Sequence, residues 1–195
     1  MRKRNARRRV VLLCSLVASM SLVMSVAFFG TSGAAPSHRP DAWIKLCGPR
    51  NTCLNAPWHP WAGNNVYNTT GRGQKVSAGV EEGNMIRFWI LFQNDGFASD
   101  TLHVRGCSGT GAFPVRVNRG AWRFYTNRAV ITPAFKKGTA SFGFPPSSKE
   151  KNTIITLTFR ANTSSRGASY SCPVTVHSGV QPSLKDTVIA RLTTI

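Results

Sequence analysis

The chain has 195 residues and a formal net charge of +18, because 25 lysines and arginines stand against only 7 aspartates and glutamates. Seven acids and four histidines are a small supply for acid–base catalysis, and the sequence has no G-x-S-x-G, no H-E-x-x-H and no phosphate-binding loop. We therefore expect no enzyme activity, no metal site and no cofactor, and a binding or structural role instead.

The N-terminus has the pattern of a secretory signal. Residues 2–9 carry six positive charges, residues 10–29 are apolar or small, and small residues lead to Pro36. We expect a signal peptide over residues 1–34, with cleavage after Ala34 and loss of Cys14. The alternative is an uncleaved membrane anchor over residues 10–29, because this apolar run approaches the roughly 20 residues that span a bilayer.

Residues 35–40 read as a linker, and a first strand is expected at 41–46. The central hairpin then occupies residues 86–105. Apolar residues alternate along its first arm, with Ile86, Phe88, Ile90 and Phe92 on one face and Arg87 and Gln93 on the other. This pattern predicts a strand buried on one side, followed by a turn and a second strand that begins at Leu102.

Similar short alternating segments run to the end of the chain. No segment after the signal keeps an apolar 3.6-residue period over three turns. With the segments above, the expected strands lie at 75–80, 113–117, 122–125, 130–131, 142–144, 155–160, 170–176 and 188–192. Short strands separated by turn residues predict an all-β fold, an antiparallel immunoglobulin-like β-sandwich over residues 41–195, preceded by the hydrophobic signal helix.

Four cysteines remain after the signal, and in an exported protein they are expected to form disulfides. Cys47 and Cys53 flank a turn with a proline, while Cys172 falls on the inward face of its strand and Cys107 lies just past the central hairpin. Of the three pairings we expect Cys47–Cys53 and Cys107–Cys172. The second closes a loop of about 65 residues, worth on the order of 4 kcal/mol. The C-x5-C spacing fits no compact zinc-ligand pattern.

Basic residues dominate the part after the signal. Loss of the six in residues 2–9 leaves 19 against 7 acids, a charge of +12, which attracts polyanions. One stretch, 116–128, interleaves basic and aromatic residues, as a site for a nucleic acid strand or a glycan would. Its candidate polyanion-binding residues are Arg116, Arg119, Arg123 and Arg128. An ordinary solvated pair of strands has the same pattern.

Several segments resemble a known family. They are GNNVYNTTGRGQ at 63–74, FQNDGFASDTLHVRG at 92–106, GAFPVRV at 111–117 and PSLKDTVIARL at 182–192. Together they are similar to the CARDB-like (cell-adhesion-related) immunoglobulin-like domains of bacterial exported and cell-surface proteins. The resemblance implies a sandwich of seven or more strands that acts as a spacer, stalk or adhesion module without catalytic residues. This sequence departs from the pattern by its single copy and its cysteine pairs.

The shared polar residues have a structural interpretation that needs no family. Asn94, Asp95 and Gly96 tolerate the φ values of a tight turn, and Asp100 can accept backbone N–H groups where the next strand begins. Asp95, Asp100 and Asp186 could offer oxygen atoms to a calcium ion, but no D-x-D-x-D loop accompanies them. We predict structural roles for these residues.

These observations predict a non-catalytic, exported or cell-surface module with a structural or adhesive role. The alternative is a basic binding module for an anionic glycan, a cell-wall polymer or extracellular nucleic acid. Expected partners are a cell-wall or surface polymer or another surface protein, with weak, non-specific binding to polyanions. The expected location is outside a bacterial cell or at its surface, with membrane contact only if residues 10–29 stay attached.

Overall fold

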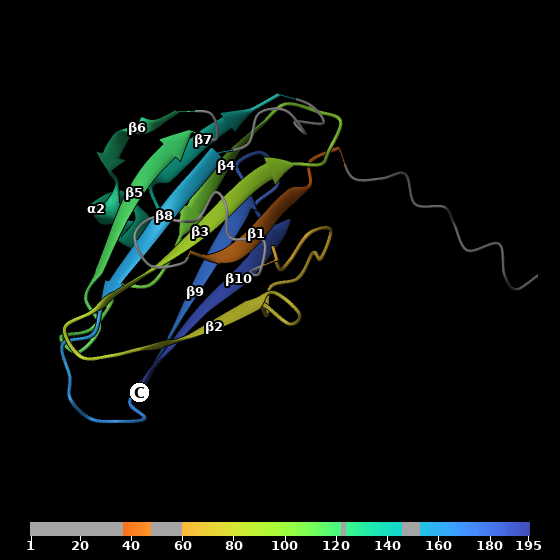
Figure 1. Cartoon of the computed structure of the whole chain (residues 1–195). Coiled ribbons are helices and arrows are strands. Elements are labelled where there is room, and N and C mark those ends of the chain that lie inside the picture. The colour runs from red at the N-terminus through yellow and green to blue at the C-terminus, as the bar shows by residue number, and fades with distance from the viewer. Residues whose placement is uncertain (1–36, 48–59, 122–123, 146–152) are drawn as a thin grey trace, which may run out of the picture. The chain divides into compact units, whose positions relative to one another are not determined.

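The computed structural model describes residues 37–47, 60–121, 124–145 and 153–195 (Figure 1), except the side chains of residues 120–128. These residues belong to the second of two units of the chain, Pro36–Ile195. The predicted signal segment, its alternative as an anchor and Cys53 lie outside the described residues. No helix within the described residues is long and apolar enough to cross a membrane.

Strands account for most of the described chain, as the alternating pattern predicts. They are β1 (Pro40–Cys47), β2 (Lys75–Val80), β3 (Met85–Asn94), β4 (Asp100–Arg105), β5 (Val115–Ala121), β6 (Phe124–Val130), β7 (Ala140–Phe144), β8 (Thr153–Arg160), β9 (Ser169–Ser178) and β10 (Lys185–Thr194). The segment predicted as a linker contributes to this framework. The Ser37 and Arg39 carbonyls accept hydrogen bonds from the Ala98 and Asp95 amides at 2.9 and 2.8 Å, and β1 begins at Pro40.

The strands form two sheets packed face to face. Sheet A has the order β1-β3-β8-β5-β6, and sheet B has the order β2-β10-β9-β4-β7. Figure 1 looks onto sheet A. The expected all-β sandwich is confirmed, but not its purely antiparallel pairing, because β2 lies parallel to β10. The crossover that parallel neighbours need in place of a tight turn is supplied by the chain between Val80 and Lys185, which contains the strands from β3 to β9.

The core lies between the sheets and is built from the alternating residues. Phe88, Ile90 and Phe92 of β3 are fully buried, and Phe88 contacts Phe159 of β8 edge-on with ring centroids 6.1 Å apart. Val174 on β9 comes from sheet B and is equally buried. The inward face of the predicted hairpin is therefore confirmed.

The opposite face of β3 differs from the prediction. Arg87 lies there, as expected, but Trp89 is only 7% exposed, Leu91 1% and Gln93 6%. Trp89 and Leu91 belong to a second apolar cluster with Ile154 on the outward side of sheet A. The prediction of a half-buried strand was wrong because the outward face of β3 is also covered, with Trp43 and Trp61 packed against this second cluster.

One short helix, α2 (Thr132–Lys137), was not predicted. Its six residues are too few to show a helical period, and a strand was expected nearby at residues 130–131. Pro133 stands in its first turn, Gly138 ends it in the left-handed conformation, and Phe135 is fully buried.

Candidate functional site

A buried polar network lies where β1, β3 and β10 meet, and Asp186 is its inner part. Its carboxylate is fully buried and accepts hydrogen bonds from the backbone amides of Ala42 at 2.8 Å, Asn68 at 3.1 Å and Thr187 at 2.8 Å. The Gln74 Nε2 amide donates to both carboxylate oxygens, at 2.9 and 3.1 Å. One side chain thus joins β1 of sheet A to β10 of sheet B.

Asp41 forms the outer part of the polar network. Its Oδ2 accepts hydrogen bonds from the Trp43 indole N–H, from Gln93 Nε2 at 3.1 Å and from the Asn65 amide at 3.4 Å. Its Oδ1 has no hydrogen-bond partner among the described residues, although the residue is fully buried. A buried carboxylate oxygen without a donor is costly when charged. The site therefore favours the neutral carboxyl.

Asp95 joins the network through the turn after β3. Its Oδ1 accepts a hydrogen bond from Gln93 Nε2 at 2.8 Å, and its Oδ2 accepts one from the Tyr67 hydroxyl. The Arg39 guanidinium lies over the Tyr67 ring, 3.6 Å from its centroid. Three carboxyl groups, those of Asp41, Asp95 and Asp186, are thereby held near one another.

Burial raises the pKa values of Asp41 and Asp186. The pKa of Asp41 is raised to about 7, mainly by burial and also by the charges of Asp95 and Asp186, while the hydrogen bonds from Trp43 and Asn65 act to lower it. Burial also raises the pKa of Asp186, against its hydrogen bonds. Both buried carboxyl groups therefore favour the protonated form more than a solvent-exposed aspartate does.

The turn after β3 contains Gly96 for a different reason than the predicted one. Gly96 does not adopt a positive φ; instead, a Cβ at this position would lie 2.2 Å from the Ser37 carbonyl oxygen. Asn94 Oδ1 accepts from the Gly96 amide at 3.0 Å. Asp100 accepts a backbone N–H as predicted, from Gly179 at 3.2 Å in the β9–β10 connection, which is distant in sequence.

Asp100 lies apart from the polar network in its contacts. Its second oxygen is 3.7 Å from His38 Nδ1. Within the described ranges, no group of three or more histidine, cysteine, aspartate or glutamate side chains is arranged to hold a metal ion. Asp95, Asp100 and Asp186 therefore form no such group.

The predicted basic stretch divides between the two sides of sheet A. Arg116 is exposed on the outward side, paired with Thr158 of β8. Arg119 is also exposed; it has the parity of the buried Val117, and its guanidinium lies 4.8 Å from the centroid of the Phe142 ring in sheet B. The side chains of Arg123 and Arg128 lie outside the described residues.

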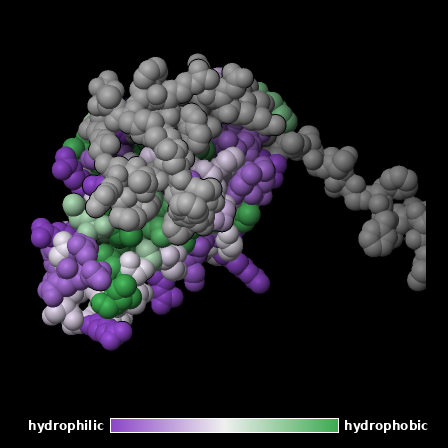
Figure 2. All heavy atoms as spheres, viewed as in Figure 1, coloured by the Kyte–Doolittle hydropathy of each residue, from purple (hydrophilic) through white to green (hydrophobic). Residues whose placement is uncertain are grey.

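A different set of arginines shares one side. Arg87 of β3 and Arg116 of β5 flank Thr158 in neighbouring strands, and Arg160 follows two residues later on β8. We call these three residues the basic face. Neither Arg116 nor Arg160 forms an ion pair with an acid among the described residues. Figure 2 shows hydrophilic residues gathered where β8 ends and β3 and β5 begin.

Sequence reasoning missed the basic face because Arg87, Arg116 and Arg160 are far apart in the chain. Only the register of the sheet places them together. The alternation of outward residues within each strand was the available signal, but it could not show which strands are neighbours.

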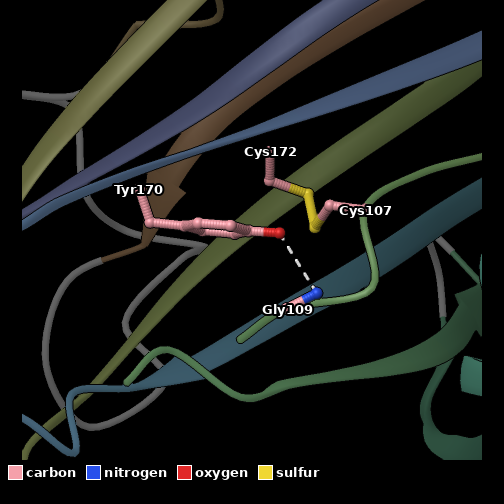
Figure 3. The surroundings of a disulfide bond; sticks show 4 residues. All are labelled: Cys107, Gly109, Tyr170 and Cys172. Carbon is pink, nitrogen blue, oxygen red and sulfur yellow. Dashed lines mark hydrogen bonds between the residues drawn. A yellow bond between two sulfur atoms is a disulfide. The ribbon is translucent and has the colours of Figure 1, made fainter. Parts of the chain in front are cut away.

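The disulfide Cys107–Cys172 is present, as predicted, with a sulfur–sulfur distance of 2.04 Å. Tyr170, two residues before Cys172 on β9, accepts a hydrogen bond from the Gly109 amide at 3.1 Å (Figure 3). Both contacts hold the segment that follows β4. Cys47 is also disulfide-bonded. Its predicted pairing with Cys53 stays a prediction.

Comparison with known proteins gives a distant likeness. No family model matches the chain, and no curated protein matches it. Among solved structures it is similar to the CARDB domain of PF1109 from Pyrococcus furiosus, at 9% identity and a TM-score of 0.32, over 80% of this chain and 96% of that one. The likeness to CARDB-like domains drawn from the sequence motifs is thus found among solved structures as well.

Two further solved structures are similar to parts of the chain. The N-terminal domain of PorA is 11% identical, with a TM-score of 0.40, over 62% of this chain and 86% of its own. A family 123 glycoside hydrolase from Clostridium perfringens is 7% identical, with a TM-score of 0.40, over 63% of this chain. The aligned part is only 23% of the length of that hydrolase.

Proposed function

We propose that this chain is an exported, non-catalytic β-sandwich module with a structural or adhesive role at the cell surface. The observation that carries the proposal is the path of the chain through the sandwich. Ser37 pairs with the turn after β3 at one end, whereas the Ile195 amide donates to Val80 at the other (Figure 1). The ten residues of β10 span about 30 Å between these ends. Such a module separates what is attached to its two ends.

The polar network supports a mechanical role. Asp186 and Asp41 join β1, β10 and the segment before β2 close to the point where the chain enters the sandwich. Pulling on the N-terminal side would load this junction first. The hydrogen bonds there would resist separation of the two sheets.

Export is supported by two independent features. The basic and apolar N-terminal segments are typical of a secretory signal. The disulfide Cys107–Cys172 is of the kind that persists in oxidising compartments outside the cytosol.

The basic face supports a second candidate function, the binding of an anionic polymer such as a cell-wall polymer or acidic glycan. Three arginines on neighbouring strands can contact successive negative groups of a flexible chain. Such binding is salt-sensitive and indifferent to sequence.

The two candidates are separated by one experiment. The exported protein is applied to its own cell-wall fraction and to immobilised heparin, and eluted with a salt gradient. The test variant carries Arg87→Gln, Arg116→Gln and Arg160→Gln; the matched control removes three exposed charges elsewhere, at Arg72, Arg166 and Arg191. Earlier elution of the test variant alone supports the anionic-polymer function. Equal elution of both variants would favour the structural or adhesive role, and any retention on the wall fraction would then depend on contacts outside the basic face.

A further inference from the structure

Two histidines face each other on the outward side of sheet B. His103 of β4 and His177 of β9 are direct partners in the antiparallel register, while the adjoining Leu102 and Val176 point into the core. Their imidazole rings are nearly parallel, with centroids 5.3 Å apart and an interplanar angle of 19°. Both side chains are half-buried, so part of the pair remains accessible to solvent.

The surroundings of the two histidines leave ring nitrogens free to bind a ligand. His177 Nδ1 lies 3.1 Å from the Ser178 carbonyl oxygen, an acceptor to which an Nδ1–H donates. The lone pair of His177 then lies on Nε2. Gly179 leaves room for the other ring, because a Cβ there would come within 3.0 Å of His103 Nε2. A carbonyl that holds one nitrogen of an imidazole is the usual support of a metal-binding histidine.

We propose that His103 and His177 form a two-imidazole clamp for a divalent transition-metal ion. Imidazole nitrogen favours Cu²⁺, Ni²⁺ and Zn²⁺, with Cu²⁺ bound most tightly, whereas Ca²⁺ and Mg²⁺ prefer oxygen. Neighbouring positions on paired strands place Cβ atoms about 5 Å apart. Rotation of the His103 ring brings one of its nitrogens to an ion bound at His177 Nε2, while His177 keeps its Nδ1 contact with the Ser178 carbonyl. No third histidine, cysteine or carboxylate among the described residues completes the group, so water fills the other positions.

The neighbours of the pair set how tightly the clamp binds. Lys185 of β10 is paired with His177, and Ser141 of β7 is paired with His103. Arg105 has the same outward parity as His103 on β4. The two cationic groups oppose a metal ion, so we expect weak to moderate affinity. Lys185→Gln should tighten binding by removing a charge, and Lys185→His should tighten it more by adding a third imidazole.

The test is calorimetric titration of the exported protein with CuCl₂ in a buffer that does not chelate copper. We expect one ion per molecule. His103→Gln and His177→Gln should each lower the affinity about tenfold or more. The control is a double variant, His38→Gln with His59→Gln, which removes the other two histidines of the chain and should keep the affinity. Thermal unfolding without metal checks that every variant is folded.

Three results would overturn the clamp. Unchanged copper affinity in both single variants would place the ion elsewhere, and so would loss of binding in the control. A Lys185→His variant with the affinity of the parent protein would show that the outward row on β4, β9 and β10 does not converge on an ion. This last measurement keeps the proposal testable even if a glutamine variant misfolds.

Discussion

The polar network and the basic face differ in where their ionisable side chains lie and in what these side chains contact. Asp41 and Asp186 are fully buried, and nearly all their oxygen atoms accept hydrogen bonds from backbone, amide or indole groups. Arg116 and Arg160 are exposed and make no ion pair with a described acid. We infer from this difference that the buried acids stabilise the fold, whereas the two exposed arginines are available to contact a partner.

Asp186→Ala should have the largest effect on stability. It leaves the Ala42 and Asn68 amides and the Gln74 amide without their buried acceptor, and such losses sum to about 4 kcal/mol. The free energy of unfolding in urea measures this cost. Glu82→Ala, at an exposed turn, should change it by less than about 0.5 kcal/mol. Similar losses in both variants would remove the contrast between buried and exposed acids.

The pH dependence should be nearly as large. The pKa of Asp41 is about 7 in the folded protein, against 3.8 for an unperturbed aspartate, so the folded state holds a proton that the unfolded state releases in this range. Stability is then highest below pH 3.8 as far as this group is concerned, and falls as the pH rises toward 7. Between about pH 5 and pH 8 the loss should be on the order of 3 kcal/mol. The raised pKa of Asp186 acts in the same direction.

Asp41→Asn isolates this contribution. The asparagine oxygen can take the place of Asp41 Oδ2 and accept the same hydrogen bonds. Its NH₂ group then takes the place of Oδ1, which has no hydrogen-bond partner among the described residues. Urea midpoints at about pH 5 and pH 8 should therefore differ less in the variant than in the parent protein. An unchanged pH slope would mean that another group titrates.

Gly96→Ala should have an intermediate effect of about 1 to 3 kcal/mol, because a new Cβ would overlap the Ser37 backbone. The variant should loosen the pairing of residues 37–39, which amide hydrogen exchange at Ala98 and Asp95 would report. Gly143→Ala, where an added Cβ meets nothing within 4 Å, is the matched control. Equal exchange rates in both variants would contradict the close approach.

The smallest stability effect is expected at the basic face. Arg116→Gln and Arg160→Gln should each change the free energy of unfolding by less than about 0.5 kcal/mol, since neither arginine is paired with a described acid. A larger cost in thermal or urea unfolding would mean that these arginines support the fold, and would weaken the contrast with the polar network.

Sequence reasoning located most strands because they follow from local patterns, and it chose the disulfide Cys107–Cys172 from the inward parity of Cys172 and the place of Cys107 after the hairpin. Alternation identified the inward residues Phe88 and Val174, and parity placed Cys172 toward the core. It failed for Trp89, whose burial depends on what covers the outward side of sheet A. It also missed α2, whose short length carries no period.

The candidate sites were less accessible from the sequence. A structural role was predicted for Asp186, but not its partners, because Ala42 and Gln74 are more than 100 positions away in the chain. The grouping of Arg116 with Arg119, Arg123 and Arg128 stays a prediction. Arg116 and Arg119 are both exposed, but they have opposite parity on β5, which the sequence stretch did not take into account.

The β-rich class, the positions of the inward side chains and the excess of positive charge could all be read from the amino-acid sequence. These depend on period, composition and parity within single segments. Three features became known only from the folded chain: β2 lies parallel to β10, Asp41 is held near Asp186, and His103 faces His177. The physical reason is that pairing between strands is chosen by the packing of two sheets together, which no segment specifies alone.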